Sequence, residues 1–362
     1  MIEKYEILGK EALKLKPVSK SAFLEFSDSF VQIQSFIEEK IRIEKDFVKN
    51  TIQGAELKFI INLNKNFGKF LLSVFELGIL SCLPKEGIWY YSVISSRGFD
   101  DAFFSRFFFN WSMAIQSIIN PPQSHELIKI VDYFRENVKN FKKAALSPFD
   151  KENEKAKEFL SYLMNKNRKG AADYALALLK KGDSPHYLFS YVLSQAMKKA
   201  GVLWQLNKIE VNDVHVATDI CHYVMYRIVD SFEKRTKLPY RIAVVCAPGE
   251  EHEFGAELVE SLLELEGWNI VDIGHISPEE DMISSIKKDT PDVIVLSVTM
   301  TANLPVAIKM AKRIRGEFED IKVIGGGTEY LSKEPIFKEV FDAVAFGVED
   351  VHNKALKIVG EK

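Results

Sequence analysis

Apolar residues recur at the spacing of one helix face through the first 145 residues, and no segment there alternates as a half-buried strand would. This spacing predicts helices over 26–47, 57–83 and 99–119. The second helix is expected to stop before Pro84 and the third at Pro121-Pro122. Proline ends a helix because it lacks a backbone donor and clashes with the preceding turn.

A polar stretch around residue 150 interrupts this pattern, and four shorter amphipathic segments follow it. They lie near 153–166, 169–181, 185–204 and 210–233. Ser184 followed by Pro185 is typical of a helix start, because serine caps the first turn and proline leaves no unpaired N–H there. Short connections between helices of this length predict an antiparallel four-helix bundle.

The period changes after residue 240, where short runs rich in β-branched residues alternate with helical stretches. The runs are 241–246, 269–273, 292–297, 322–325 and 343–346. The helical stretches are 255–266, 278–288, 304–318, 333–340 and 350–359. Strands that are apolar on both faces and alternate with helices indicate a doubly wound parallel sheet. The expected fold class is α plus α/β, with a helical domain over 1–148, the bundle over 152–236 and the sheet domain over 239–362.

Composition is that of a globular protein, with 47% hydrophobic and 27% charged residues. The longest apolar runs fall short of the ~20 residues that a membrane span needs, and the N-terminus lacks the apolar core of a signal peptide. Cys82, Cys221 and Cys246 are too widely spaced for a disulfide framework or a CxxC metal site. We therefore expect a cytoplasmic protein with no membrane association.

Charge and aromatic residues narrow the role of the helical domain. Residues 1–150 hold 20 Lys and Arg against 18 Asp and Glu, and the remainder holds 28 against 33. Direct nucleic-acid binding is not expected, because a DNA-binding module normally shows a concentrated basic face. The aromatic cluster between Phe103 and Trp111 favours a buried core or a dimer helix over a chromophore pocket. A protein partner or self-association is the expected role.

The loop after the first predicted strand carries the first candidate chemistry. It contains Glu250-x-His252-x-x-Gly255 and no GxGxxG, so a dinucleotide site is unsupported. A histidine that ligates a metal usually gives its second ring N–H to a carboxylate, and Glu250 is placed to accept it. On this loop alone, a solvent-exposed histidine remains the alternative.

Two more strand ends carry small residues. The third strand finishes at Ser297-Val-Thr299, and the fourth ends at Gly325-Gly326-Gly327. Hydroxyl groups can donate to a ligand, and the missing Cβ lets a flat ligand or a long tail lie against the backbone. A satisfied hydroxyl and a tight turn are the alternatives. Ligands of such sheets bind at the carboxyl ends of the strands, where all these residues are expected to meet.

Taken together, Glu250-x-His252-x-x-Gly255, Ser297-x-Thr299 and Gly325-Gly326 resemble the signature of the cobalamin-binding domain, a Rossmann-like (flavodoxin-like) fold. The preceding bundle resembles the four-helix cap of that family. The resemblance implies that His252 replaces the cofactor's own base as the lower ligand of cobalt, with Glu250 as its orienter. It also implies that Ser297, Thr299 and the two glycines line a slot for the nucleotide tail.

The cap carries a second resemblance. Trp204, followed by Val211 and His215, is similar to the cap pattern of light-responsive cobalamin regulators, in which the tryptophan covers the upper axial face. Val214 stands where that family has a glutamate, and Gln205 stands where some members have a cobalt-capturing histidine. The upper ligand therefore stays open between adenosyl and methyl.

The last cap residues of interest are His215 and His222, for which both a packing role and a ligand role stay open.

The resemblance implies a cobalamin-binding sensor, light-responsive and not an enzyme, that signals through its helical domain to a protein partner. The alternative is a corrinoid protein that carries a methyl group for a methyltransferase system. A scaffold with a vestigial pocket is a third reading. An enzyme acting alone is disfavoured, because no substrate barrel of ~250 residues is present.

Overall fold

The computed structural model describes residues 2–44, 55–145, 153–232 and 236–360. The chain divides into two compact units, Met1–Pro148 and Phe149–Lys362. No helix in the described residues is long and apolar enough to cross a membrane. The cytoplasmic location stays a prediction.

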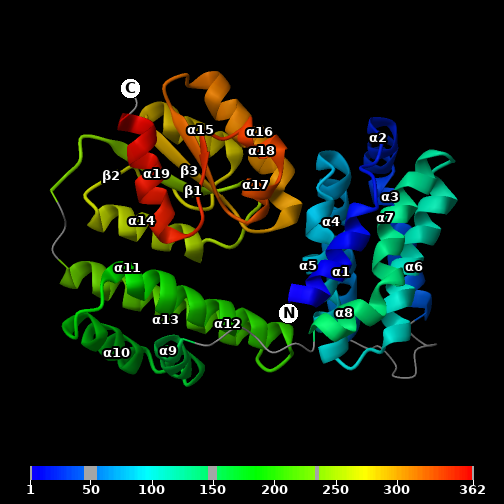
Figure 1. The fold of residues 1–362 in the computed structure, drawn as a ribbon, viewed down its shortest axis with the longest axis horizontal. Coiled ribbons are helices and arrows are strands. Elements are labelled where there is room, and N and C mark those ends of the chain that lie inside the picture. Colours follow the sequence, from blue (N-terminus) through cyan, green and yellow to red (C-terminus); the bar gives the residue numbers. More distant parts are fainter. Residues whose placement is uncertain (1, 45–54, 146–152, 233–235, 361–362) are drawn as a thin grey trace. The chain divides into compact units, whose positions relative to one another are not determined.

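The first unit consists of helices throughout its described part (Figure 1). They are α1 (Ile2–Leu13), α2 (Lys20–Asp28), α3 (Phe30–Glu44), α4 (Ala55–Leu77), the 3₁₀ turn η1 (Leu80–Cys82), α5 (Leu83–Ser96), α6 (Asp101–Ile118), α7 (Gln123–Glu136) and α8 (Val138–Ala145). Their core is aromatic: the ring of Phe67 meets those of Phe108 and Trp111 edge-on, with centroids 4.9 and 5.4 Å away. All three side chains are fully buried, so Phe108 and Trp111 of the predicted aromatic cluster lie in a buried core, whereas Phe109 of the same cluster is 42% exposed.

Two of the helices predicted for this unit have the wrong bounds. The one over 26–47 is interrupted at Ser29, whose backbone N–H closes α2, and α3 begins at Phe30; residues 45–47 lie outside the described residues. The one over 57–83 ends at Leu77, because Gly78 adopts a left-handed φ of +67°. Pro84 does not end a helix but lies in the first turn of α5, where its missing N–H costs nothing.

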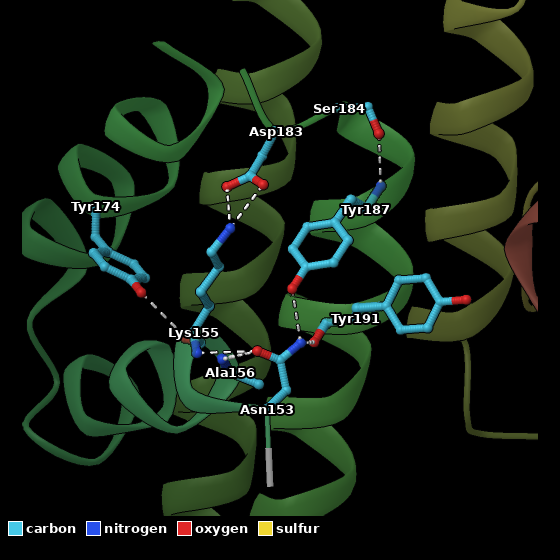
Figure 2. Close-up of polar contacts among 8 residues, drawn as sticks. All are labelled: Asn153, Lys155, Ala156, Tyr174, Asp183, Ser184, Tyr187 and Tyr191. Carbon is cyan, nitrogen blue, oxygen red and sulfur yellow. Dashed lines mark hydrogen bonds and ion pairs between the residues drawn. The ribbon is translucent and has the colours of Figure 1, made fainter. Parts of the chain in front are cut away.

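The second unit begins with the predicted bundle, here called the cap. It comprises α9 (Glu154–Met164), α10 (Arg168–Lys180), α11 (Pro185–Tyr187), the π-helical segment η2 (Leu188–Leu193), α12 (Ser194–Gln205) and α13 (Val211–Ser231). The Ser184 hydroxyl accepts the N–H of Tyr187, as the Ser-Pro start predicted. Figure 2 also shows how the chain enters the cap: the Asn153 amide donates to the Tyr187 hydroxyl, and Lys155 pairs with Asp183 at 2.7 Å. These contacts fix the start of α9 against α11.

The sheet domain has five parallel strands in the order β2-β1-β3-β4-β5. The strands are β1 (Arg241–Cys246), β2 (Asn269–Ile270), β3 (Val293–Val298), β4 (Lys322–Gly327) and β5 (Ala343–Val344). The helices are α14 (Phe254–Leu265), α15 (Glu279–Lys288), α16 (Leu304–Glu317), preceded by the turn η3 (Thr301–Asn303), α17 (Tyr330–Lys333), α18 (Pro335–Lys338) and α19 (Val348–Gly360). The doubly wound α/β prediction is confirmed, and its switch point lies between β1 and β3.

Three sheet-domain elements differ from their prediction. β2 and β5 pair over only two residues each, since both are edge strands whose apolar runs continue beyond the hydrogen-bonded ladder. The helix predicted over 333–340 is split at Glu334, because Pro335 starts a new helix there.

The cap packs on the sheet domain through α13 and α14. Val224 and Ile228 of α13 belong to one hydrophobic core with Leu258 and Leu262 of α14. The cap and the sheet are therefore held by one continuous core.

Candidate functional site

In the loop from β1 to α14, the exposed side chain of His252 is held by the buried carboxylate of Glu250. The Glu250 side chain is fully buried, whereas that of His252 is 57% exposed. His252 Nδ1 lies 2.5 Å from Glu250 Oε1, and the same oxygen accepts the backbone N–H of His252 at 3.1 Å. Nε2 has no hydrogen-bond or ion-pair partner among the residues that the structure describes. The loop therefore holds one ring nitrogen and leaves the other for a ligand.

Glu250 is held by the neighbouring loop as well. Its second oxygen, Oε2, accepts the backbone N–H groups of Thr299 and Met300 at 2.9 and 2.8 Å and the amide of Asn303 at 3.2 Å. These three donors follow β3, so they tie the β3–α16 loop to the β1–α14 loop. Neither Met300 nor Asn303 was predicted from the sequence.

The electrostatics follow from these contacts. Burial alone would raise the pKa of the Glu250 carboxyl, but the hydrogen bonds from His252 and the two backbone donors outweigh it and lower the pKa to about 2. The hydrogen bond to Glu250 raises the pKa of His252, against the opposing effect of desolvation. Glu250 is therefore ionised at neutral pH and orients the imidazole through Nδ1.

His252 stands apart from any cluster of metal-ligating side chains among the described residues. Over the described ranges, no group of three or more His, Cys, Asp or Glu side chains is arranged to hold a metal ion. A metal bound here would need most of its ligands from elsewhere, as from a macrocycle. This donor set fits a cofactor that brings its own equatorial ligands.

Strand register lines up the other predicted residues. Ser297 pairs with Cys246 on one side and with Gly326 on the other, so the three residues form a row at the carboxyl end of the sheet. Ser297 is buried, and its hydroxyl has no partner in the part of the chain that the structure describes. The row therefore offers an unused hydroxyl beside a glycine.

The three successive glycines of β4 differ in whether the fold itself requires glycine at that position. A Cβ on Gly325 would lie 3.0 Å from the Phe341 ring, and one on Gly327, where φ is +102°, would lie 2.4 Å from the Val298 carbonyl. A Cβ on Gly326 would meet nothing nearer than the Ala345 carbonyl at 3.9 Å. Gly326 is buried yet has room for a methyl group, so the fold alone does not require glycine there. A glycine at this position fits a surface against which a ligand lies close to the backbone.

Thr299 and Gly255 lie at the same end of the sheet in different roles. The Thr299 side chain is exposed, and its backbone N–H donates to Glu250 Oε2. Gly255 is the second residue of α14, and a Cβ there would meet open space. The structure brings both residues to the loops around His252.

The predicted cap residues gather around one helix connection. Trp204 lies half-buried one residue before the end of α12. Asn207, with a left-handed φ of 54°, lies in the connection that follows. Val211 starts α13 with 54% of its surface exposed, and His215, also exposed, follows one turn later on the same face. Val211 and His215 thus form one accessible face of α13.

His222 has a packing role, and a second histidine shares it. His222 lies 2.5 Å from Glu257 of α14 and packs its ring on Phe254. His186 lies 2.6 Å from Glu266, just beyond the other end of α14. Glu257 raises the pKa of His222, partly offset by desolvation. Two imidazole–carboxylate pairs therefore join the cap to the helix that follows the His252 loop.

Two family matches fall within the second unit. Residues 240–357 match the family described as B12 binding domain. Residues 156–228 match a second family of the same description. The two ranges correspond to the sheet domain and to the cap.

Curated relatives carry corrinoid names. Trimethylamine corrinoid protein 1 of Methanosarcina acetivorans is 25% identical over 162 residues, 43% of this chain and 75% of that protein. Dimethylamine corrinoid protein 1 of the same organism is 25% identical over 162 residues, with shares of 43% and 76%. The structure of the Methanosarcina barkeri monomethylamine corrinoid protein matches with a TM-score of 0.50 at 22% identity, over 57% of this chain and 98% of that one. This last likeness shows a shared fold.

Proposed function

Because the chain belongs to the cobalamin-binding proteins that combine a helical cap with a B12 binding domain, we propose that it carries a methyl group between partner methyltransferases. Cobalamin is its cofactor. The methylamine corrinoid names of its relatives support this carrier function and lend no support to the light-responsive sensor. A carrier of this kind serves enzymes without being one.

The observation that carries the proposal is the Glu250–His252 pair. In our proposal Nε2 of His252 is the lower ligand of cobalt, because Nδ1 is already held by an ionised carboxylate and the His252 side chain is exposed. Bound cobalamin supplies a metal centre that can accept and donate a methyl group. The protein's part is to hold the imidazole as the correct tautomer and to keep its orientation.

The carboxyl-end row supplies the second half of the binding site. Once His252 has displaced the cofactor's own base, the nucleotide tail needs a separate place. Ser297 offers a buried hydroxyl, and Gly326 offers volume that the fold leaves unfilled. We assign the tail slot to these two residues together with Gly325, with Thr299 and Gly255 at its rim.

The cap supplies the upper face in this proposal. Trp204, Val211 and His215 lie around the α12–α13 connection, two of them accessible. Such a lid restricts water over a bound methyl group, and a methyltransferase would have to displace it. The first unit, which neither family match reaches, is left as the surface for a protein partner or for self-association.

Transfer of labelled methyl tests the carrier function. The protein is loaded in the dark with carbon-14 methylcobalamin and mixed with extract of its source organism, as the supply of methyltransferases, and a small thiol. We expect label to leave the wild-type protein and to appear on a small molecule, and His252→Ala to hold little cofactor. Label that stays on the protein in the dark, with a change of oligomeric state on illumination, would instead establish the sensor.

A further inference from the structure

Helix α14 lies between the cap and the sheet (Figure 1) and carries acidic side chains without basic ones. It contains Glu257, Glu260 and Glu264 and no Lys, Arg or His, and Glu266 follows directly after it. Carboxylates at an internal interface need partners, because burying an unpaired charge is costly. The identity of these partners decides how pH acts on the interface.

Histidines supply the partners from both sides of α14. Four of the seven histidines of the chain form such pairs: His222 with Glu257 at 2.5 Å, His275 with Glu260 at 3.2 Å, and His186 and His352 with Glu266 at 2.6 and 3.9 Å. Neither Glu257 nor Glu260 has a Lys or Arg partner among the residues that the structure describes. Lysine and arginine stay charged near neutral pH, whereas histidine loses its proton there. The charge balance along α14 therefore depends on pH.

Two of the four pairs cross from the cap to α14. His222 belongs to α13 and pairs near the start of α14, whereas His186 belongs to α11 and pairs just beyond its end. The side chains of His222 and Glu257 are 21% and 15% exposed, and those of His186 and Glu266 are 25% and 5% exposed. Solvent and salt screen such partly buried pairs less than surface pairs. The cap is therefore held by an imidazole–carboxylate pair at each end of α14.

The charged groups around His222 favour its protonated form. Glu257 faces it from α14, Glu253 from the residue before that helix, and Asp219 from one turn earlier on α13. The hydrogen bond to Glu257 raises the pKa of His222 and outweighs the desolvation that would lower it. The pair that joins α13 to α14 is therefore charged over a wider pH range than a free histidine would allow.

His186 faces a carboxylate that a second histidine also approaches. Its Nε2 lies 2.6 Å from Glu266 Oε1, and His352 Nε2 lies 3.9 Å from Oε2. Nδ1 of His352 accepts the indole N–H of Trp268 at 3.1 Å. Because indole only donates, His352 is neutral while this bond is made, with its proton on Nε2. The negative charge of Glu266 is therefore left for His186.

We propose that His222 and His186, when protonated, hold the cap on α14, and that loss of their protons as pH rises loosens the cap. A histidine whose pKa is raised in the docked state stabilises docking below its free pKa of about 6.5, and this contribution is lost as pH rises through the higher docked pKa. The apolar core shared by α13 and α14 does not titrate, so pH changes the docked fraction and not the fold. Docking is a property of the chain itself, and the inference goes beyond the methyl-carrier function.

Energy transfer between two dyes measures docking in the full-length, cofactor-free protein. The dyes are attached at Asn212→Cys of α13 and Lys312→Cys of α16, two exposed positions, while the native cysteines are all buried. The transfer efficiency is recorded from about pH 5 to about pH 8, the range in which histidine titrates. His222→Gln, His186→Gln and the double variant are compared with the parent protein, because glutamine stays polar and carries no charge.

His275→Gln is the matched control, because it removes an imidazole–carboxylate pair from the same helix without touching the cap. We expect the parent protein and His275→Gln to lose transfer efficiency as pH rises, and the double variant to be nearly independent of pH. At low pH each single cap variant should lower the docking constant about tenfold, near the lower end for a hydrogen bond to a charged group. Glu257→Gln, which leaves the cap sequence unaltered, should reproduce His222→Gln.

An efficiency that stays constant with pH in the parent protein would overturn the inference, and so would an unchanged pH dependence in the double variant. Equal loss of the pH dependence in His275→Gln would assign the effect to the sheet domain and would also contradict the inference. Neither bound cobalamin nor methyl transfer enters these readouts. Failure of the carrier function would therefore leave them as they are.

Discussion

The substitution Gly326→Ala tests whether glycine at this position is required by the fold or by the cofactor. Replacing it with alanine places a Cβ 3.9 Å from the nearest atom, the Ala345 carbonyl, which is ordinary van der Waals contact. Alanine in a strand is favoured over glycine by about 0.5–1 kcal/mol, because glycine loses more backbone freedom on folding. The cofactor-free variant should therefore melt at or slightly above the wild-type temperature.

The same methyl group should obstruct the tail slot. Overpacking a fitted site costs about 1–3 kcal/mol, which corresponds to about 5- to 150-fold weaker binding at about 1.4 kcal/mol per factor of ten. Equilibrium binding of methylcobalamin, followed by the visible spectrum, measures the loss. His252 should still ligate the cobalt in whatever complex forms.

Gly325→Ala is the matched control. Its Cβ would lie 3.0 Å from the Phe341 ring, so the packing of the cofactor-free fold has to shift. We expect a lower melting temperature for this variant before any cofactor is added. If Gly326→Ala is destabilised as much as Gly325→Ala, or binds methylcobalamin as tightly as the wild type, the assignment of Gly326 to the slot is refuted.

Two further predictions concern stability. Glu257 raises the folded-state pKa of His222, so the stabilisation from this pair is complete below the unfolded pKa of about 6.5 and is lost as pH rises through the higher folded pKa. The melting temperature of the wild type should therefore fall more steeply with rising pH than that of His222→Gln. Parallel curves of melting temperature against pH would contradict this. Phe67→Ala should lower the free energy of unfolding of the first unit by about 3–5 kcal/mol, as large-to-small changes at buried aromatics do, and should leave cobalamin binding intact. Calorimetry measures the first effect and a binding titration the second. Loss of binding would argue against separate units.

Local patterns predicted the parts of the site that lie close together in sequence. The pairing of Glu250 with His252 follows from a two-residue spacing on one loop, and the row through Ser297 and Gly326 follows from strands of similar length in a parallel sheet. The Asn303 contact joins residues 53 apart. An asparagine ahead of Leu-Pro is indistinguishable by sequence from a helix cap, so the contact could not be foreseen.

The fold was predicted best where periodicity was strong and least well at its interruptions. The central strands β1, β3 and β4 agree closely with their apolar runs, whereas the edge strands are shorter because pairing ends before the apolar residues do. Gly78 ends a helix through a left-handed backbone that the surrounding apolar pattern conceals. Local breaks of this kind depend on tertiary packing rather than on composition.

The central claim is that a nitrogen of this chain, Nε2 of His252, is the lower ligand of cobalt. Electron paramagnetic resonance of the cobalt(II) form tests it directly, because an axial nitrogen-14 splits each cobalt line into a triplet and nitrogen-15 splits it into a doublet. Protein labelled with nitrogen-15 histidine and loaded with unlabelled cobalamin should show doublets, which His252→Ala should lose. Triplets in the labelled protein would show that the cofactor keeps its own base and would contradict the account.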